Sequence, residues 1–135
     1  MAPVHQTPIS VRYAETDQMG WVHHSVYPVY FEQARVEQMI ALGIPYDQLE
    51  AEGILLPLFE LHVNYRRPLR FGETFVVHSR MGPVTGVRLR VEYEIFCDDQ
   101  LCVTGYTLHA FTGRNGRPIR PPNRLVQCLQ SSFPG

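Results

Sequence analysis

A carboxylate and two histidines lie close together near the N-terminus and carry the residue types used by hydrolytic sites. Asp17 is in the segment Glu15 to Gly20, where Gly20 permits a sharp turn, and His23 and His24 follow just before a helical pattern. A carboxylate opposite a helix start combines a base or nucleophile with unpaired backbone N–H donors. This combination is the minimum equipment for attacking a carbonyl group and stabilising the oxyanion that forms.

Each of these residues also has a plainer interpretation. An aspartate in a turn often accepts hydrogen bonds from its own backbone, and a histidine at a helix start can simply hold that start in place. His23 and His24 are adjacent, and no HxxxH, HExxH or cysteine-rich pattern completes a metal site, so we expect no metal. Glu32 is interpreted as the ion-pair partner of Arg35 or of another chain.

Other hydrolytic mechanisms find no support in the sequence. Ser25, Cys97 and Cys102 have no GxSxG elbow and no identifiable base, which argues against a serine or cysteine nucleophile. The three cysteines, including Cys128, lack CxxC spacing and are predicted to be buried, reduced thiols. Together with an N-terminus that lacks a signal-peptide core, they lead us to expect a cytoplasmic protein.

Composition narrows the class of protein further. The chain has 135 residues, a formal charge of −1, 44% hydrophobic and 19% charged residues, which fits a single soluble domain over residues 1–135. No apolar run is long enough for a membrane span, and the balanced charge argues against nucleic-acid binding. All twelve basic residues are arginine, so lysine Schiff-base chemistry is excluded.

Hydrophobic periodicity predicts a strand, a long helix and then four strands. We expect a strand over 9–14, a helix capped by Ser25 and ending near Leu42, and a short helix over 45–52. Four strands follow at 59–65, 74–81, 87–95 and 101–112, and Asn123 begins a terminal helix. Short connections between successive strands predict an antiparallel sheet, and the aromatic helix is expected to be largely buried against it. The class is therefore α+β.

The stretch YAETDQMGWVHHSVYPVYFEQAR resembles the Y-x-x-T-D-x-x-G-x-V pattern, continued by the Y-x-E-x-A-R helix, of acyl-CoA thioesterases of the 4-hydroxybenzoyl-CoA thioesterase and YbgC type. NYRRPLRFGE resembles that family's next motif. The resemblance implies a hotdog fold, a five-stranded antiparallel sheet wrapped around one long helix. It also implies Asp17 as catalytic residue, a His24 backbone N–H that polarises the thioester carbonyl, and a dimer or dimer of dimers with active sites between subunits.

Substrate-binding residues are assigned on the same basis. The acyl pocket is expected to be lined by Tyr27, Phe31, Leu56, Leu58 and Phe59, although most of these suit a core equally well. For the phosphates of coenzyme A the candidates are Arg66, Arg67, Arg88, Arg90, Arg114 and Arg117. Arg88 and Arg90 share one strand face, where they form either a phosphate fork or a solvated surface. Coenzyme A is part of the substrate, and no other cofactor is expected.

The sequence thus predicts an acyl-CoA thioesterase, with Asp17 as nucleophile or as general base on water. The alternative is a hotdog module that binds acyl-CoA or acyl carrier protein without catalysis. Asp17 separates the two, because a binding module needs no carboxylate beside the carbonyl.

Overall fold

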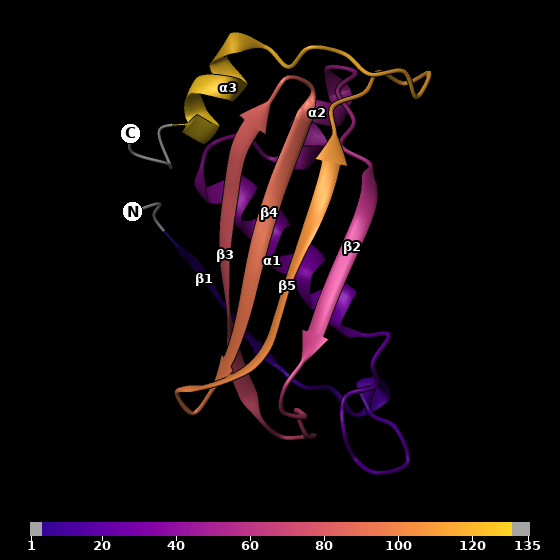
Figure 1. Ribbon diagram of the computed structural model, residues 1–135, viewed down its shortest axis with the longest axis vertical. Helices are drawn as coiled ribbons and strands as arrows, with labels where there is room; N and C mark the ends of the chain where they lie inside the picture. The colour runs from indigo at the N-terminus through magenta and orange to yellow at the C-terminus, as the bar shows by residue number, and fades with distance from the viewer. Residues whose placement is uncertain (1–3, 131–135) are drawn as a thin grey trace.

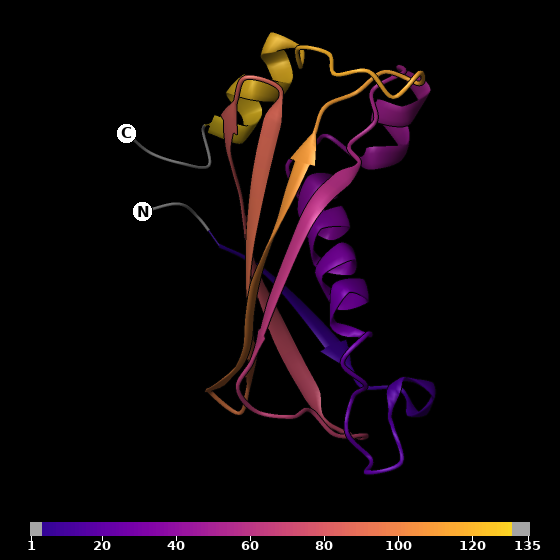
Figure 2. The ribbon, with the colours of Figure 1, turned by 45° about the vertical axis from the view of Figure 1, so that its right-hand side comes forward.

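A computed structural model describes residues 4–130, in which one antiparallel sheet packs against a long helix. The strands lie in the order β1-β3-β4-β5-β2, so the first two strands in the sequence form the two edges of the sheet. Figure 1 shows α1 behind the sheet, and Figure 2 shows it running along one face. The elements are β1 His5–Ser10, the 3-10 turn η1 Tyr13–Glu15, α1 Tyr27–Ala41, α2 Tyr46–Ala51, β2 Leu58–Tyr65, β3 Thr74–Thr85, β4 Arg88–Cys97, β5 Gln100–Ala110 and α3 Asn123–Gln130.

The first strand ends earlier than the alternation predicted. β1 covers His5–Ser10, and Tyr13 is 77% exposed within the 3-10 turn that follows. The Glu15 carboxylate accepts hydrogen bonds from the Arg12 N–H at 2.9 Å and from the Tyr30 hydroxyl at 2.8 Å. These two bonds curl the chain toward α1, which an alternating pattern cannot reveal. The predicted strand over 9–14 was therefore wrong in its bounds.

α1 matches the expected helix except at its cap. Pro28 lies in the first turn, and Gly43, with φ +81°, follows the C-cap Leu42. The prediction of Ser25 as N-cap was wrong, because Val26 occupies that position and the Ser25 hydroxyl bonds His23 Nδ1 at 2.8 Å. The helix is buried along one side, while Val29 on the other side is 54% exposed. It is therefore less enclosed than its aromatic content suggested.

The sheet confirms the strongest alternation in the sequence. Leu89, Val91, Tyr93 and Ile95 of β4 are buried, and β4 joins β5 through a turn in which Asp98 and Asp99 have positive φ. β3 continues to Thr85, past the predicted end at Met81, because the sheet absorbs Gly82-Pro83 as a register shift between Met81 and Val84.

One close approach between α1 and the sheet depends on a glycine. The Phe31 ring is fully buried and stacks on Tyr93 with centroids 4.2 Å apart. A Cβ added at Gly105 of β5 would meet the Phe31 ring at 2.7 Å and the His62 carbonyl oxygen at 2.5 Å. Gly105 therefore allows the aromatic side of α1 to lie directly on the sheet.

Cys97 and Cys102 are buried thiols outside any disulfide, as predicted, whereas Cys128 is only partly buried. Among residues 4–130, no helix is both long enough and apolar enough to cross a membrane.

Candidate active site

The loop that carries Asp17 is held closed by its own backbone. Asp17 donates its N–H to the Trp21 carbonyl at 2.7 Å, and Gly20 donates to the Asp17 carbonyl at 3.0 Å with φ +77°. Asp17 Oδ1 accepts the Met19 N–H at 2.8 Å and the Trp21 N–H at 3.2 Å. The carboxylate is therefore oriented through one oxygen, and among the described hydrogen bonds none uses Oδ2.

The start of α1 is anchored to the same loop. His23 donates its N–H to the Glu15 carbonyl at 2.9 Å, and the Tyr65 hydroxyl of β2 donates to the His24 carbonyl at 2.8 Å. The His23 and His24 rings lie 4.1 Å apart. Among the described hydrogen bonds none uses the His24 N–H, so this donor at the helix start remains available.

Glu15 connects the loop to the interior. Burial raises the pKa of this carboxyl, but hydrogen bonds from the Arg12 backbone, Tyr30 and the Arg12 side chain outweigh it and hold the pKa below its usual range. The Tyr30 hydroxyl is itself buried, and its pKa is raised by burial and by Glu15. A charged Glu15 therefore ties the 3-10 turn, and with it the Asp17 loop, to α1.

One cavity of about 290 Å³ brings the two predicted catalytic positions together. Its lining includes Asp17, His24, Tyr27, Tyr65, Arg66 and Arg67. Tyr27 is 2% exposed and packs edge-on against Tyr65 with centroids 5.3 Å apart, and burial raises the pKa of its hydroxyl to about 12. A carboxylate, a free N–H donor and two arginines thus surround one space with a neutral aromatic wall.

The other expected acyl-pocket residues lie elsewhere. Phe31 is a core residue beneath Tyr93 and lines none of the described cavities. Leu58 and Phe59 begin β2, at the opposite end of the strand from Tyr65, and Leu58 borders a second cavity together with Leu56. Only Tyr27 of the predicted set lines the Asp17 cavity of the same chain.

Four of the six arginine candidates divide into two groups. Arg90 is 3.0 Å from Glu92 in an ion pair and lies over the Tyr106 ring at 4.1 Å, on the sheet face away from α1. Arg88 lies over the Phe59 ring at 5.3 Å. In contrast, Arg66 and Arg67 are exposed at the rim of the Asp17 cavity. Position therefore favours Arg66 and Arg67 as partners for a substrate in that cavity.

Sequence reasoning did not select Trp21 or Tyr65 for the site, although both line the cavity. Tyr65 is 41 residues from His24, and only the sheet order brings β2 next to the helix start. Its place at the end of an alternating strand, directly before Arg66-Arg67-Pro68, was the available signal.

A group of metal-type ligands occurs away from this cavity. Ligand atoms of Glu73, Cys97 and Asp98 lie within 4.8 Å of one another. Burial and the neighbouring Glu73 raise the pKa of the Cys97 thiol to about 11, and the thiol donates to Glu73 Oε2 at 3.5 Å. The Cys97–Glu73 hydrogen bond accounts for the closeness of two of these groups, and Asp98 is exposed at the surface.

Comparison with known proteins identifies the family. Residues 11–129 match the family described as "Thioesterase-like superfamily". The chain is 40% identical over 93 residues to "Putative acyl-CoA thioesterase YneP" of Bacillus subtilis (strain 168), covering 69% of this chain and 67% of that protein.

Solved structures agree with this family. The hypothetical protein TT1821 from Thermus thermophilus superposes with a TM-score of 0.91 and 40% identity, covering 96% of this chain and 99% of that chain. A DHNA-CoA thioesterase from Staphylococcus aureus superposes with a TM-score of 0.86 and 32% identity, covering 96% and 88%. The predicted hotdog fold is confirmed, and the chain belongs to the thioesterase-like superfamily as a hotdog-fold thioesterase.

Proposed function

We propose that the protein hydrolyses acyl-CoA thioesters to a carboxylic acid and free coenzyme A at the Asp17 cavity. The observation that carries this proposal is the shared cavity of the Asp17 carboxylate and the unused His24 N–H at the start of α1. The N–H is placed to donate to the thioester oxygen as negative charge develops on it. The thiolate leaves without needing a strong acid, so no further catalytic group is required.

Asp17 has two possible roles in this reaction. As a general base, Oδ2 takes a proton from water while the water oxygen attacks the carbonyl carbon. As a nucleophile, Oδ2 attacks the carbon, the thiolate departs, and water opens the resulting mixed anhydride. Both routes use the oxygen left free when Oδ1 accepts the Met19 and Trp21 N–H groups.

The two arginines at the rim suit the charged end of the substrate. Arg66 and Arg67 are exposed where the cavity meets solvent, and guanidinium groups bind phosphate well. We therefore assign the coenzyme A phosphates to them in preference to Arg88 and Arg90, since Arg90 already engages Glu92 and Tyr106. A thioester on an acyl carrier protein would present a phosphate too, so either carrier suits these two arginines.

A dimer formed through β2 belongs to the proposal. Leu61 and Tyr65 on this edge strand are 42% and 51% exposed, and the outer backbone groups of an edge strand seek a partner. Antiparallel pairing of two copies around the middle of β2 would set the Leu58 end of one copy beside the Tyr65 end of the other. Leu58 and Phe59 would then approach the partner's cavity, as the sequence interpretation requires. We further propose that dimers pair and that the protein is cytoplasmic.

The test follows thiol release from short, branched, long and aromatic acyl-CoAs. Asp17→Asn is expected to lose at least about two orders of magnitude in kcat/KM, because it removes the base or nucleophile but keeps the shape. Asp47→Asn, a matched change at an exposed carboxylate of α2, should leave activity unchanged. Equal turnover by Asp17→Asn would exclude Asp17 from catalysis. A wild-type protein that binds acyl-CoA without hydrolysing it would instead be the non-catalytic module.

A further inference from the structure

A second cavity, of about 480 Å³, lies at the other end of β2 from Tyr65, beside α1 and α2. Val36 and Met39 of α1 and Leu56 and Leu58 around the start of β2 supply apolar walls. One charged side chain in the lining, Arg35, is largely buried, with only 15% of its side chain exposed. A buried guanidinium in an apolar wall is costly unless its donors are used.

The described contacts use few of the five N–H donors of Arg35. Its Nη1 donates to the Tyr93 hydroxyl at 3.3 Å. Its Nη2 lies 3.9 Å from Glu32 Oε2, which is beyond hydrogen-bond distance, and the Glu32 side chain is 66% exposed. Glu32 is therefore a loosely held counter-ion, and Arg35 retains donor capacity toward the cavity that it lines.

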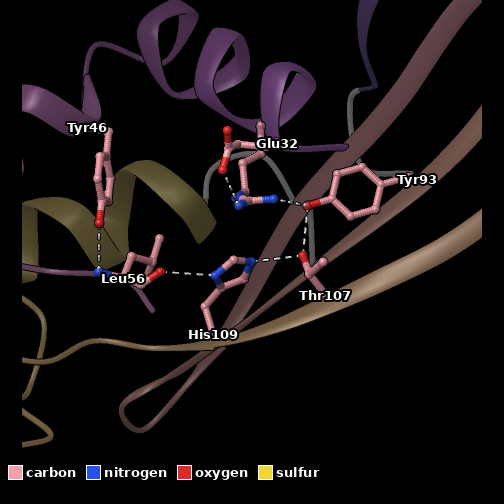
Figure 3. A network of polar contacts seen from close by, with 7 residues as sticks. Glu32, Tyr46, Leu56, Tyr93, Thr107 and His109 are labelled. Atoms are coloured by element: carbon pink, nitrogen blue, oxygen red, sulfur yellow. Dashed lines mark hydrogen bonds and ion pairs between the residues drawn. The ribbon is translucent and has the colours of Figure 1, made fainter. Parts of the chain in front are cut away.

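The polar network behind Arg35 offers it no second acceptor. Tyr93, Thr107 and His109 are linked in a row that ends at the Leu56 carbonyl (Figure 3). The successive hydrogen bonds measure 2.7, 2.8 and 3.1 Å. A carbonyl only accepts, so His109 Nδ1 carries the proton. Burial, reinforced by Arg35, lowers the pKa of His109 to about 4, so the ring is neutral and its Nε2 accepts from Thr107.

The donor and acceptor of every hydrogen bond in the row follow from the Leu56 carbonyl, which can only accept. Thr107 has given its only hydrogen to His109, so it accepts from the Tyr93 hydroxyl. Tyr93 has then given its own hydrogen to Thr107, so it accepts from Arg35. The row therefore accepts one hydrogen bond from Arg35, and its other bonds are made among its own members and to the Leu56 carbonyl. The remaining donors of Arg35 must be satisfied from the cavity side.

We propose that this cavity binds a molecule with an apolar body and an anionic end, whose carboxylate or phenolate oxygens pair with Arg35 in place of Glu32. Two sources share this chemistry. One is a free carboxylic acid, and the other is the far end of an acyl group that carries such an anion. The second source rests on the proposed function, because its thioester end must react at an Asp17 cavity.

Octanoate binding to the whole protein, measured by calorimetry and by amide NMR shifts, tests the site. Octanoate should bind at least about tenfold more tightly than 1-octanol and shift the amides of Val36, Met39 and Leu58. Arg35→Met, which keeps apolar volume but removes the charge, should lose this preference for the anion. Glu32→Gln should tighten octanoate binding several-fold, because the competing carboxylate is gone.

A matched control is Arg80→Met, since Arg80 pairs with Glu94 at 3.1 Å on the sheet face away from α1. This variant should bind octanoate like the wild type. If Arg35→Met does not fold, the Glu32→Gln comparison still decides the matter. The proposal is overturned if octanoate and octanol bind alike, if Glu32→Gln leaves octanoate affinity unchanged, or if the shifts are confined to the residues around Asp17.

Hydrolysis of two acyl-CoAs of equal length, one ending in a carboxylate and one in a methyl group, separates the sources. If the acyl end occupies the cavity, Arg35→Met lowers kcat/KM about tenfold for the carboxylate-ended substrate only. If the natural occupant is a free acid, both substrates react alike in both proteins while octanoate binding is lost. Asp17→Asn should abolish hydrolysis and keep octanoate binding, so failure of the proposed function is distinguishable.

Discussion

At the scale of single residues, Asp17 combines the two interpretations that the sequence left open. Oδ1 accepts the Met19 N–H two residues on, which is the bond expected of a simple turn aspartate. The same bond orients the carboxylate within a cavity that also contains the start of α1. The hydrogen bonds accepted by Oδ1 therefore fix the carboxylate and leave Oδ2 for the proposed reaction.

The role proposed for His24 rests on its backbone, which gives a prediction for its side chain. His24→Ala keeps the N–H at the helix start and should lower kcat/KM by less than about tenfold, far less than Asp17→Asn. Steady-state thiol release on the best acyl-CoA measures both. A loss from His24→Ala as large as that from Asp17→Asn would assign the imidazole a direct part in the reaction.

At the scale of elements, the approach of α1 to β5 depends on the missing side chain of Gly105. An added Cβ would meet the rigid Phe31 ring at 2.7 Å and a strand carbonyl at 2.5 Å, and neither can move aside cheaply. Gly105→Ala should reduce the free energy of unfolding in urea by about 1–3 kcal/mol. Gly113→Ala, whose Cβ would have its closest contact at 3.3 Å with an asparagine side chain, should cost less. Equal stability of Gly105→Ala and wild type would show that the helix shifts freely.

The packing of α1 on the sheet also makes stability depend on pH through His109. The folded-state pKa is depressed to about 4 from an ordinary 6.5, so between these values the unfolded chain binds a proton that the folded chain does not. The contribution of neutral His109 to the free energy of unfolding is therefore fully present above pH 6.5 and is lost as the pH falls toward 4. Between pH 7.5 and 5 the loss should be about 2 kcal/mol.

Urea unfolding at both pH values checks this prediction against His109→Gln, which does not titrate. The variant is expected to be less stable at pH 7.5 but to lose less on acidification than the wild type. If both proteins lose the same amount, His109 is not the group responsible.

At the scale of the whole molecule, β2 is a sheet edge that no other described strand of the same chain covers. It is an edge strand with exposed apolar side chains, next to one cavity at each end. Such an edge is normally blunted or covered. Association through β2 would cover it and bring the two kinds of cavity, from different copies, side by side.

A charge on this edge should therefore change the oligomeric state. Leu61→Arg is expected to shift the molar mass measured by light scattering from a dimer or dimer of dimers toward the monomer, because a buried unpaired guanidinium opposes pairing. Ile40→Arg, at a helix position that is 58% exposed, should remain at least dimeric. A wild-type protein that is monomeric throughout the micromolar range would contradict association through β2.

Local chemistry was readable in the sequence, because neighbouring residues decide it. The turn at Asp17 and Gly20, the alternation of β4 and the end of α1 at Gly43 each depend on residues a few positions apart. The same information predicted that Asp17 and a helix start would meet, since only a short loop separates them.

Contacts between distant segments were decided only by the tertiary structure. The hydrogen bond from the Tyr30 hydroxyl to Glu15 holds the chain after Ser10 away from the sheet. Tyr65 bonds the start of α1 only because β2 forms the edge of the sheet. Phe31 lies in the core and Arg35 lines a cavity because α1 packs on the sheet face that carries Tyr93. Periodicity shows which side of an element is apolar, but not which other element that side meets.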